Sequence, residues 1–207
     1  MFVDPLGDTI LVDHRGSIIR NDKKDKTVML YTFKDGSTQY LGELGGKIDI
    51  NTIYKNLLAE NIKEAKGLVD PRDFRKYVTD RGKWDYKLRK GTIYGLGNSD
   101  HTKFIFQGQE MESQDLGNHH FGVVAKATGF FYEKLILVKA GENQMTKPGA
   151  SKPEWQKYII HRERVPLEHG GSYTIEYKEW LPPYGDDPRD QYWIIQGFNY
   201  FREFNKR

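Results

Sequence analysis

Residues 115–131 read DLGNHHFGVVAKATGFF. Apolar side chains recur at helical spacing from Phe121 to Val138, which predicts a single helix through this part of the chain. Asp115 can cap the start of that helix. The same stretch gathers a carboxylate, an amide and two imidazoles between two glycines, so it is also a candidate catalytic cluster.

The two histidines of this stretch have different predicted environments. If the helix begins near Leu116, the ring of His120 points partly into the protein and His119 faces solvent. In a structural interpretation, His120 is a half-buried ring with satisfied hydrogen bonds. In a functional interpretation, Asn118 and His120 line a cleft, and His120 titrates near neutrality as a general acid or base.

The flanking segments predict the fold class. Short β-branched and aromatic runs in residues 1–48, with a turn at Asp35–Gly36, predict a small antiparallel sheet. Further along the chain, the patterns predict helices over residues 49–67, 70–82 and 187–204, strands over 103–106 and 172–180, and a loop over 141–152. This order predicts an α+β fold, in which a small N-terminal antiparallel β-region precedes a mainly helical core with a few further strands. We divide the chain into a β-rich segment, 1–48, and a catalytic domain, 49–207, which together form one compact unit.

Composition excludes several classes of protein. The 207 residues include no cysteine, which rules out disulfides and thiolate chemistry and leaves His and carboxylate groups as metal ligands. A net charge of +3 is small for a protein that binds duplex DNA through its phosphates, but it permits a polyanionic substrate. No apolar run has the length of a transmembrane segment, and the N-terminal MFVDPLGDTI lacks the pattern of a signal peptide.

Asp190 is a second candidate for chemistry. Asp187 can cap the last predicted helix, and Pro188 can take its first position. Asp190 then lies on the same strip as Ile194 and faces the core or a cleft. The structural alternative is a capping box of Asp187 and Asp190, and a third possibility is that these two aspartates and Asp186 hold a divalent cation.

A third candidate is the segment Trp84-Asp85-Tyr86-Lys87. If it is extended, Asp85 and Lys87 point to one side while Trp84 and Tyr86 point to the other, as in any amphipathic strand. The chain contains no Ser-His-Asp order, glycine-rich phosphate loop, HExxH motif or EF-hand loop.

Four segments, taken in order, resemble the bacterial polymorphic toxin type 44 family: GKWDYK, DLGNHHFGVVAKATGF, AGENQ and YGDDPRDQYWIIQGFNYF. Members of the family repeat a W-D-x-K segment, an N-x-H-[FY]-G segment with a glycine-containing helix, and a final D-x-x-D helix. The resemblance covers residues 40–207 and is weakest over residues 145–183. The N-terminal MFVDPLGD is also similar to the segment that follows Rhs or YD-repeat shells, where a C-terminal toxin begins.

This resemblance implies an effector toxin at the tip of a larger secreted protein, often delivered into a target cell by a type VI system. It also implies a Rhs-type delivery shell and a cognate immunity protein in the producing cell. By position, the family motif falls on Trp84, Asp85, Lys87, Asp115, Asn118, His120, Gly122, Asp187 and Asp190. We take as catalytic candidates His120, Asp190, Lys87, Asp85 and Asp115. We take as substrate-binding candidates Asn118, Trp84, Tyr86, Asp187 and Gln144.

The reaction stays open between two hydrolases and a third, non-catalytic class. In a metal-independent ribonuclease without any cofactor, His120 would be the general acid or base, Lys87 would stabilise the phosphorane, and Asp190 or Asp115 would orient the imidazole. In a peptidoglycan hydrolase, Asp85 and Asp190 would be the acid and base, and exposed aromatic side chains would stack on sugar rings. In an adaptor domain, the aspartates would only cap helices. We favour the ribonuclease, which requires Lys87, His120 and Asp190 to converge in one pocket.

Overall fold

The computed structural model describes residues 9–21, 26–32 and 34–206, and the junction-like segment MFVDPLGD lies outside them. The chain forms two compact units. The main unit spans Met1–Phe130 and Trp193–Arg207, and the hairpin unit spans Phe131–Tyr192. The predicted α+β class is confirmed, and the division of the chain at residue 48 stays a prediction.

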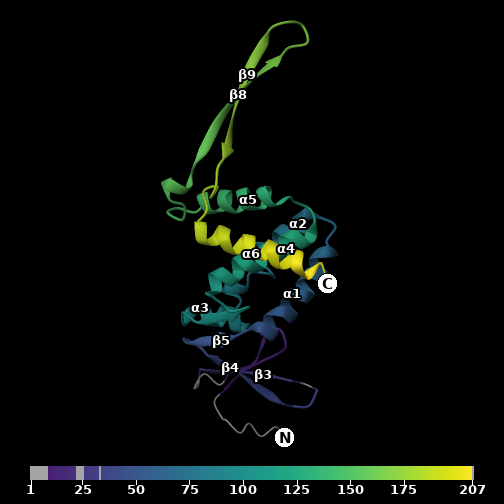
Figure 1. Cartoon of the computed structure of the whole chain (residues 1–207), viewed down its shortest axis with the longest axis vertical. Helices are drawn as coiled ribbons and strands as arrows, with labels where there is room; N and C mark the ends of the chain where they lie inside the picture. The colour runs from purple at the N-terminus through teal and green to yellow at the C-terminus, as the bar shows by residue number, and fades with distance from the viewer. Residues whose placement is uncertain (1–8, 22–25, 33, 207) are drawn as a thin grey trace. The chain divides into compact units, whose positions relative to one another are not determined.

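The described part of the main unit contains one sheet in the order β2-β1-β3-β4-β5-β6-β7. Figure 1 labels its strands β3, β4 and β5. Its strands are β1 (Ile10–Val12), β2 (Ile18–Asn21), β3 (Thr27–Tyr31), β4 (Thr38–Glu43), β5 (Lys47–Asp49), β6 (Lys103–Phe106) and β7 (Gln109–Met111). Neighbours are antiparallel except for the pairs β1–β3 and β5–β6, which are parallel. The predicted N-terminal sheet is therefore extended by a hairpin, β6–β7, that comes from the middle of the chain.

Helices of the main unit pack around a core rich in aromatic side chains. They are α1 (Asn51–Lys66), α2 (Pro71–Val78), α3 (Ile93–Ser99), α4 (Ser113–Thr128) and residues 193–204 of α6 (Pro188–Phe204), with a short 3-10 helix, η1 (Tyr86–Leu88). The helix α2 begins as its sequence predicts, because Asp70 Oδ1 accepts the backbone N–H of Arg72 at 2.8 Å. The buried face of α1 carries Ile53, Tyr54, Leu57, Leu58, Asn61, Ile62 and Ala65.

The predicted helix from residue 116 to residue 138 is wrong at both ends. It begins earlier, at Ser113, and Asp115 is its third residue rather than its cap. The Asp115 carboxylate accepts the backbone N–H of Glu112 at 2.7 Å, in a capping box that the Glu112 side chain completes. The helix stops at Gly129, whose φ of 69° is a left-handed conformation that glycine adopts without strain.

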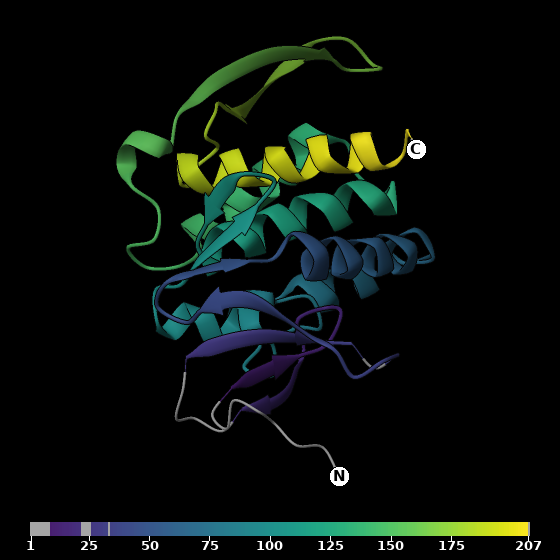
Figure 2. The same ribbon diagram turned by 60° about the horizontal axis from the view of Figure 1, so that its bottom comes forward.

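The helices α4 and α6 approach each other closely through two glycines. A Cβ atom on Gly122 would lie 2.1 Å from the carbonyl oxygen of Ile194, and one on Gly197 would lie 2.2 Å from the carbonyl oxygen of His119. Any side chain at these positions would therefore force the two backbones apart. Figure 2 shows α4 and the yellow C-terminal helix side by side.

The hairpin unit contains α5 (Glu133–Met145), the 3-10 helix η2 (Pro153–Trp155), the strands β8 (Tyr158–Pro166) and β9 (Ser172–Trp180), and the first turn of α6. The predicted strand over residues 172–180 is confirmed as β9, and its partner β8 has no counterpart among the sequence-based predictions. The predicted loop begins later than residue 141, because α5 continues to Met145. Asp187 caps α6 as predicted, with its Oδ1 atom accepting the backbone N–H of Arg189 at 2.8 Å.

Within the described residues, no helix combines the length and the apolar character that crossing a membrane requires.

Candidate functional site

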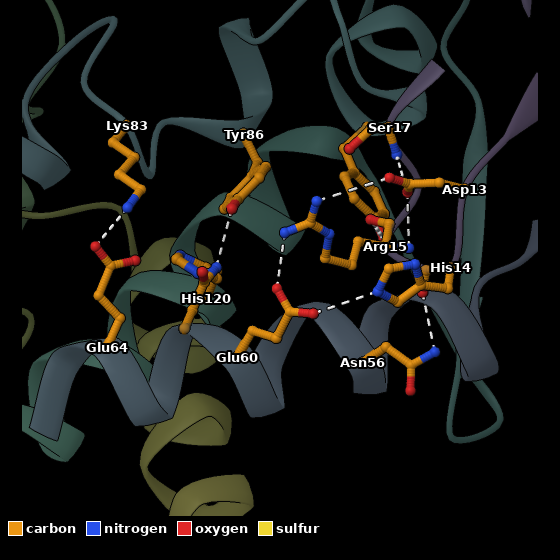
Figure 3. A network of polar contacts seen from close by, with 12 residues as sticks. Asp13, His14, Arg15, Ser17, Asn56, Glu60, Glu64, Lys83, Tyr86 and His120 are labelled. Atoms are coloured by element: carbon orange, nitrogen blue, oxygen red, sulfur yellow. Dashed lines mark hydrogen bonds and ion pairs between the residues drawn. The ribbon is translucent and has the colours of Figure 1, made fainter. Parts of the chain in front are cut away.

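His120 lies inside the main unit, with 1% of its surface exposed. Its Nε2 atom lies 2.9 Å from the side-chain nitrogen of Asn61 on α1. The same nitrogen donates a hydrogen bond to the Tyr86 hydroxyl, also at 2.9 Å (Figure 3). Nδ1 of His120 is fully buried and has no hydrogen-bond partner in the described part of the chain.

This environment keeps the His120 imidazole neutral. Burial, with a smaller contribution from His119, lowers the pKa of His120 to about 3. The expectation that His120 titrates near neutrality is therefore wrong, because the cation would lose its water without gaining an acidic partner. Since Asn61 donates to Nε2, the neutral ring carries its proton on Nδ1. A buried donor without an acceptor costs about 1–3 kcal/mol, so this ring arrangement is unfavourable for stability.

Two aromatic rings enclose His120. Tyr86 lies 4.8 Å away and Trp84 lies 6.0 Å away, measured between ring centroids. Trp84 is 3% exposed and packs against Phe74 and Tyr77, so it cannot serve as an open platform for sugar rings. The expectation of an extended segment is wrong here too, because the chain turns after Trp84 and enters η1.

A pocket of about 230 Å³ opens beside this buried group. We call it the charged pocket; its polar lining includes Arg15, Glu60, Asn61, Glu64, Lys83, Tyr86 and Arg89. His120 is not part of the lining, and it contacts two lining residues, Asn61 and Tyr86. In Figure 3 the side chains of Arg15 and Lys83 reach across toward the two glutamates on α1.

Ion pairs order the mouth of the charged pocket. Arg15 donates to Glu60 at 2.7 Å, and Lys83 forms an ion pair with Glu64. The turn that carries Arg15 is held by Asp13, whose Oδ1 atom accepts the backbone N–H groups of residues 15 and 17 at 2.8 Å each.

Arg89 differs from the other two cations, because it has no carboxylate partner among the described residues. Its guanidinium donates to the carbonyl oxygen of Lys83 at 2.7 Å and lies 5.7 Å from the centre of the Tyr86 ring. The charged pocket therefore offers one cation that is free to meet an anion.

Glu60 is ionised at neutral pH. Burial acts to raise the pKa of its carboxyl group, but hydrogen bonds from Arg15 and His14 outweigh that effect and hold the pKa below its usual value. The Tyr86 hydroxyl keeps its proton, because burial raises its pKa and the hydrogen bond from Asn61 opposes this only partly. Since Asn61 donates to Tyr86, the hydroxyl proton is available to a molecule in the pocket.

The other catalytic candidates of the main unit lie outside the charged pocket. The Cβ atom of Lys87 lies 3.7 Å from the place that a Cβ on Gly117 would take, so its stem runs along α4. Asp85 is buried, and its Oδ2 atom accepts the backbone N–H of Arg81 at 2.8 Å. Asp115 is buried in the capping box of α4, and Asn118 is partly buried on the same helix.

The remaining candidates belong to the hairpin unit. Gln144 donates to the carbonyl oxygen of Ala150 at 3.0 Å, and Asp190 is buried in the first turn of α6. Asp186, named above only as a possible cation ligand, has an unusual pKa. Burial raises the pKa of its carboxyl group to about 6, Asp190 adds to the rise, and a hydrogen bond from Gln191 opposes it. Because Asp190 and His120 lie in different units, the predicted meeting of Lys87, His120 and Asp190 stays a prediction.

Nowhere in the described ranges do three His, Asp or Glu side chains gather closely enough to hold a metal ion. This includes the aspartates at the start of α6.

Sequence reasoning missed Asn61, Glu60, Arg15 and Arg89. One signal for Asn61 was present, because it is a polar residue on the otherwise apolar stripe of α1, and a buried polar side chain is informative. His119 was also misjudged: it is 3% exposed, and its Nδ1 atom lies 3.0 Å from the hydroxyl of the buried Tyr54. It is buried because α4 is covered by β6 and β7 as well as by α1 and α6.

The family model for bacterial toxin 44 matches residues 73–203, which is more than half of the chain. The chain belongs to the bacterial toxin 44 family. No curated protein and no solved structure matches it. Membership identifies the chain as a toxin effector domain, is consistent with a secreted effector that acts on target cells, and in general implies a cognate immunity partner. Within the match lie His120, Tyr86, Lys83 and Arg89, whereas Arg15, Glu60 and Asn61 precede it.

Proposed function

We propose that this member of the bacterial toxin 44 family cleaves RNA without a metal ion, and that the charged pocket is its active site. One observation carries the proposal. The pocket is lined by Glu60, an ionised carboxylate, and by Arg89, which has no carboxylate partner among the described residues. It is also lined by Tyr86, whose hydroxyl keeps its proton and accepts a hydrogen bond from Asn61.

The chemistry is an attack by the ribose 2′-oxygen on the adjacent phosphorus. Glu60 takes the 2′-hydroxyl proton, the bond from phosphorus to the 5′-oxygen breaks, and the leaving oxygen takes a proton from water. The hydroxide so formed takes the proton from Glu60, which restores the carboxylate and the water. Arg89, Lys83 and the Tyr86 hydroxyl stabilise the negative charge that grows on the phosphorane oxygens. The products are a 2′,3′-cyclic phosphate and a 5′-hydroxyl.

His120 is a positioning residue in this proposal. Its ring is neutral and lies behind the pocket wall, so it acts by holding the Asn61 amide, which in turn orients the Tyr86 hydroxyl. The role that the family motif gives to Lys87 passes to Lys83, which lines the pocket. The carboxylates Asp85, Asp115 and Asp190 have no step in this reaction.

Peptidoglycan hydrolysis is the second candidate, because Glu60 and Glu64 lie one helical turn apart and both line the pocket. A pair of carboxyl groups at that spacing suits glycoside hydrolysis. One of them must then be a general acid with a raised pKa. The ion pair with Arg15 and the lowered pKa of Glu60 favour the ribonuclease instead.

We also propose delivery by a Rhs-type shell, through a type VI system, and neutralisation by a dedicated immunity protein. The support is the resemblance of MFVDPLGD to a toxin junction together with the family membership.

Inducible expression in bacteria tests the reaction, once in the cytoplasm and once with an added periplasmic signal peptide. We expect killing from the cytoplasm with degraded total RNA. The purified chain should leave 2′,3′-cyclic phosphate ends on RNA in the presence of EDTA. Killing only from the periplasm, with intact RNA and lysis, would favour cell-wall hydrolysis.

Paired variants test the site. Arg89→Gln and Lys83→Ala should abolish RNA cleavage, whereas Lys87→Ala and the exposed helix variant Arg75→Gln should retain it. If Lys87→Ala abolished RNA cleavage and Lys83→Ala retained it, the active site would be the one predicted from the family motif. Full toxicity in all four variants and in His120→Ala would support a non-catalytic domain.

A further inference from the structure

A second pocket of the main unit is lined by residues of the β6–β7 hairpin, of α4 and of α6 from Trp193 to Glu203. We call it the aromatic pocket; its volume is about 110 Å³, and its walls include Phe106, His119, Trp193 and Tyr200. It is separate from the charged pocket, and the two share no lining residue. The contacts of His119 and His120 with α1, at Tyr54 and Asn61, are two helical turns apart, which is on the order of 10 Å.

His119 presents a hydrogen-bond acceptor to the aromatic pocket. The hydroxyl of Tyr54 lies 3.2 Å from the carbonyl oxygen of Leu116 and 3.0 Å from Nδ1 of His119. Both contacts are hydrogen bonds only if Tyr54 donates to Leu116 and accepts from the Nδ1–H of His119. Nε2 then carries a lone pair, and it is the ring nitrogen left for the pocket. Burial lowers the pKa of His119 to about 3, so this acceptor is present throughout the neutral range.

The walls are shaped for a flat ring. The ring centroids of Phe106 and Tyr200 lie 5.7 Å apart, and each lies 5.7 Å from the centroid of His119. The three rings are inclined to one another and pack against each other, so a ligand ring would lie against this cluster rather than between two of its members. Aromatic walls of this kind hold nucleobases by stacking.

The rim supplies neutral hydrogen-bonding groups. Four side-chain amides surround the opening: Gln107, Gln109, Gln196 and Asn199. Among the described residues that line the aromatic pocket, Glu203 is the one charged side chain, and none is cationic. Such a lining disfavours phosphate and suits a neutral ligand with donors and acceptors along its edge, and amides form two-pronged contacts with base edges.

The rim is also held in an unfavourable backbone conformation. Gln107 has a φ of 50°, which residues other than glycine, asparagine and aspartate rarely adopt. Its backbone N–H donates to the Asn51 side chain at 2.9 Å, which ties the hairpin turn to the start of α1. Gly108, the next residue, has a φ of 78°, so the hairpin turns through two successive left-handed residues.

We propose that the aromatic pocket binds a single nucleobase of the RNA substrate, with His119 Nε2 accepting a hydrogen bond from the base edge. The base stacks on the half-buried ring of Tyr200, and the amides of Gln109 and Gln196 read its polar edge. The substrate class rests on the proposed function. Base binding would add a sequence preference to a reaction site that itself contacts only phosphate and ribose.

The test is direct binding of the four nucleosides to the purified 207-residue chain, refolded from inclusion bodies to avoid toxicity. Saturation-transfer NMR titrations with uridine, cytidine, adenosine and guanosine give the dissociation constants. The comparison ligands are N-acetylglucosamine and inorganic phosphate. The variants are Gln109→Ala and Gln196→Ala, at the rim, and the control is Gln39→Ala, an exposed glutamine on β4.

We expect saturable binding of at least one nucleoside, weakened about tenfold by each rim variant and unchanged by the control, as for the loss of one good base contact. Absence of saturable binding, or binding that neither rim variant weakens, would overturn the proposal. Saturable binding of N-acetylglucosamine in place of a nucleoside would also overturn it and assign the pocket to a glycan. Nucleoside binding in a chain that fails to cleave RNA would support this pocket while refuting the proposed reaction.

Discussion

The side-chain nitrogen of Asn61 lies 2.9 Å from Nε2 of His120, and both side chains are buried. This contact joins α1 to α4 and also sets the tautomer of the imidazole. Because the same amide donates to Tyr86, one side chain orients two groups at the charged pocket.

Asn61→Ala should destabilise the protein and stop the reaction. The variant leaves two buried acceptors, His120 Nε2 and the Tyr86 oxygen, without their donor, at a cost of about 1–3 kcal/mol in the free energy of unfolding. Urea unfolding measures this loss. The control is Asn56→Ala on the same helix, which removes only a surface contact to the His14 carbonyl and should cost less than half as much. Equal losses in the two variants would contradict the role given to Asn61.

Alanine at Gly122 or Gly197 should lower the free energy of unfolding by at least about 1–3 kcal/mol, because the new methyl group meets backbone atoms that cannot rotate away. Gly117→Ala provides a matched control in the same helix. A Cβ there would lie 3.7 Å from its nearest neighbour, in ordinary contact, and alanine favours the helix by up to about 1 kcal/mol. The unfolding temperature should therefore fall in Gly122→Ala and Gly197→Ala and rise in Gly117→Ala. A Gly122→Ala protein as stable as Gly117→Ala would refute the close approach of α4 and α6.

The two neighbouring histidines should make the main unit sensitive to mild acid. Their pKa values in the folded protein are about 3, below the ordinary value near 6.5, so the unfolded chain binds more protons between these limits. The free energy of unfolding is then unaffected above pH 6.5 and falls as the pH drops below it, by up to about 1.4 kcal/mol per pH unit for each ring. Urea unfolding from pH 7.5 to pH 5 measures the slope. The exposed variant His169→Gln should keep the same slope, and a flat profile would mean that the two buried rings bind protons equally in the folded and unfolded states.

Asp186 should have the opposite effect in the hairpin unit. Its folded-state pKa, about 6, lies above the ordinary value near 3.8. The contribution of the protonated Asp186 to the free energy of unfolding is therefore fully present below pH 3.8 and is lost as the pH rises through 6. Asp186→Asn keeps an oxygen for the Gln191 amide and removes the buried charge. We expect the variant to be more stable than wild type at pH 7.5 and no more stable at pH 4. Asp187→Asn, at the exposed cap of α6, should change stability by the same amount at both pH values. A pH-dependent gain in stability for this variant would mean that the buried charge is not on Asp186.

Local patterns predicted those parts of the fold that local interactions determine. The apolar stripe of α1, the Asp70–Pro71 start of α2 and the Asp187 cap of α6 each depend on neighbours in the sequence. The break between α4 and α5 was missed because the apolar spacing continues past Gly129, and only its left-handed backbone ends the helix. His119 was misplaced for a different reason, since its burial depends on β6, β7 and α6.

The charged pocket was predicted only in part, because its residues come from distant segments. The sequence indicated Tyr86, which lines the pocket, as a substrate-binding candidate. It indicated His120, which is buried next to the pocket lining, as the main catalytic candidate. Arg15 and Glu60 are 45 residues apart, and the partner of His120 lies 59 residues before it. No pattern in one short stretch encodes such pairs, so the motif indicated the region of the site without its charged rim.

Residues 193–204 complete a unit whose remaining described residues end at Phe130, and they supply the buried side chains of Ile194 and Phe198. Translation therefore finishes the hairpin unit before the ribosome has delivered the last wall of the main unit. Until residues 193–204 are synthesised, the face of α4 that carries Gly122 has no packing partner on α6, and the aromatic pocket lacks its lining from that helix. A nascent chain therefore cannot complete the main unit until residues 193–204 have been synthesised.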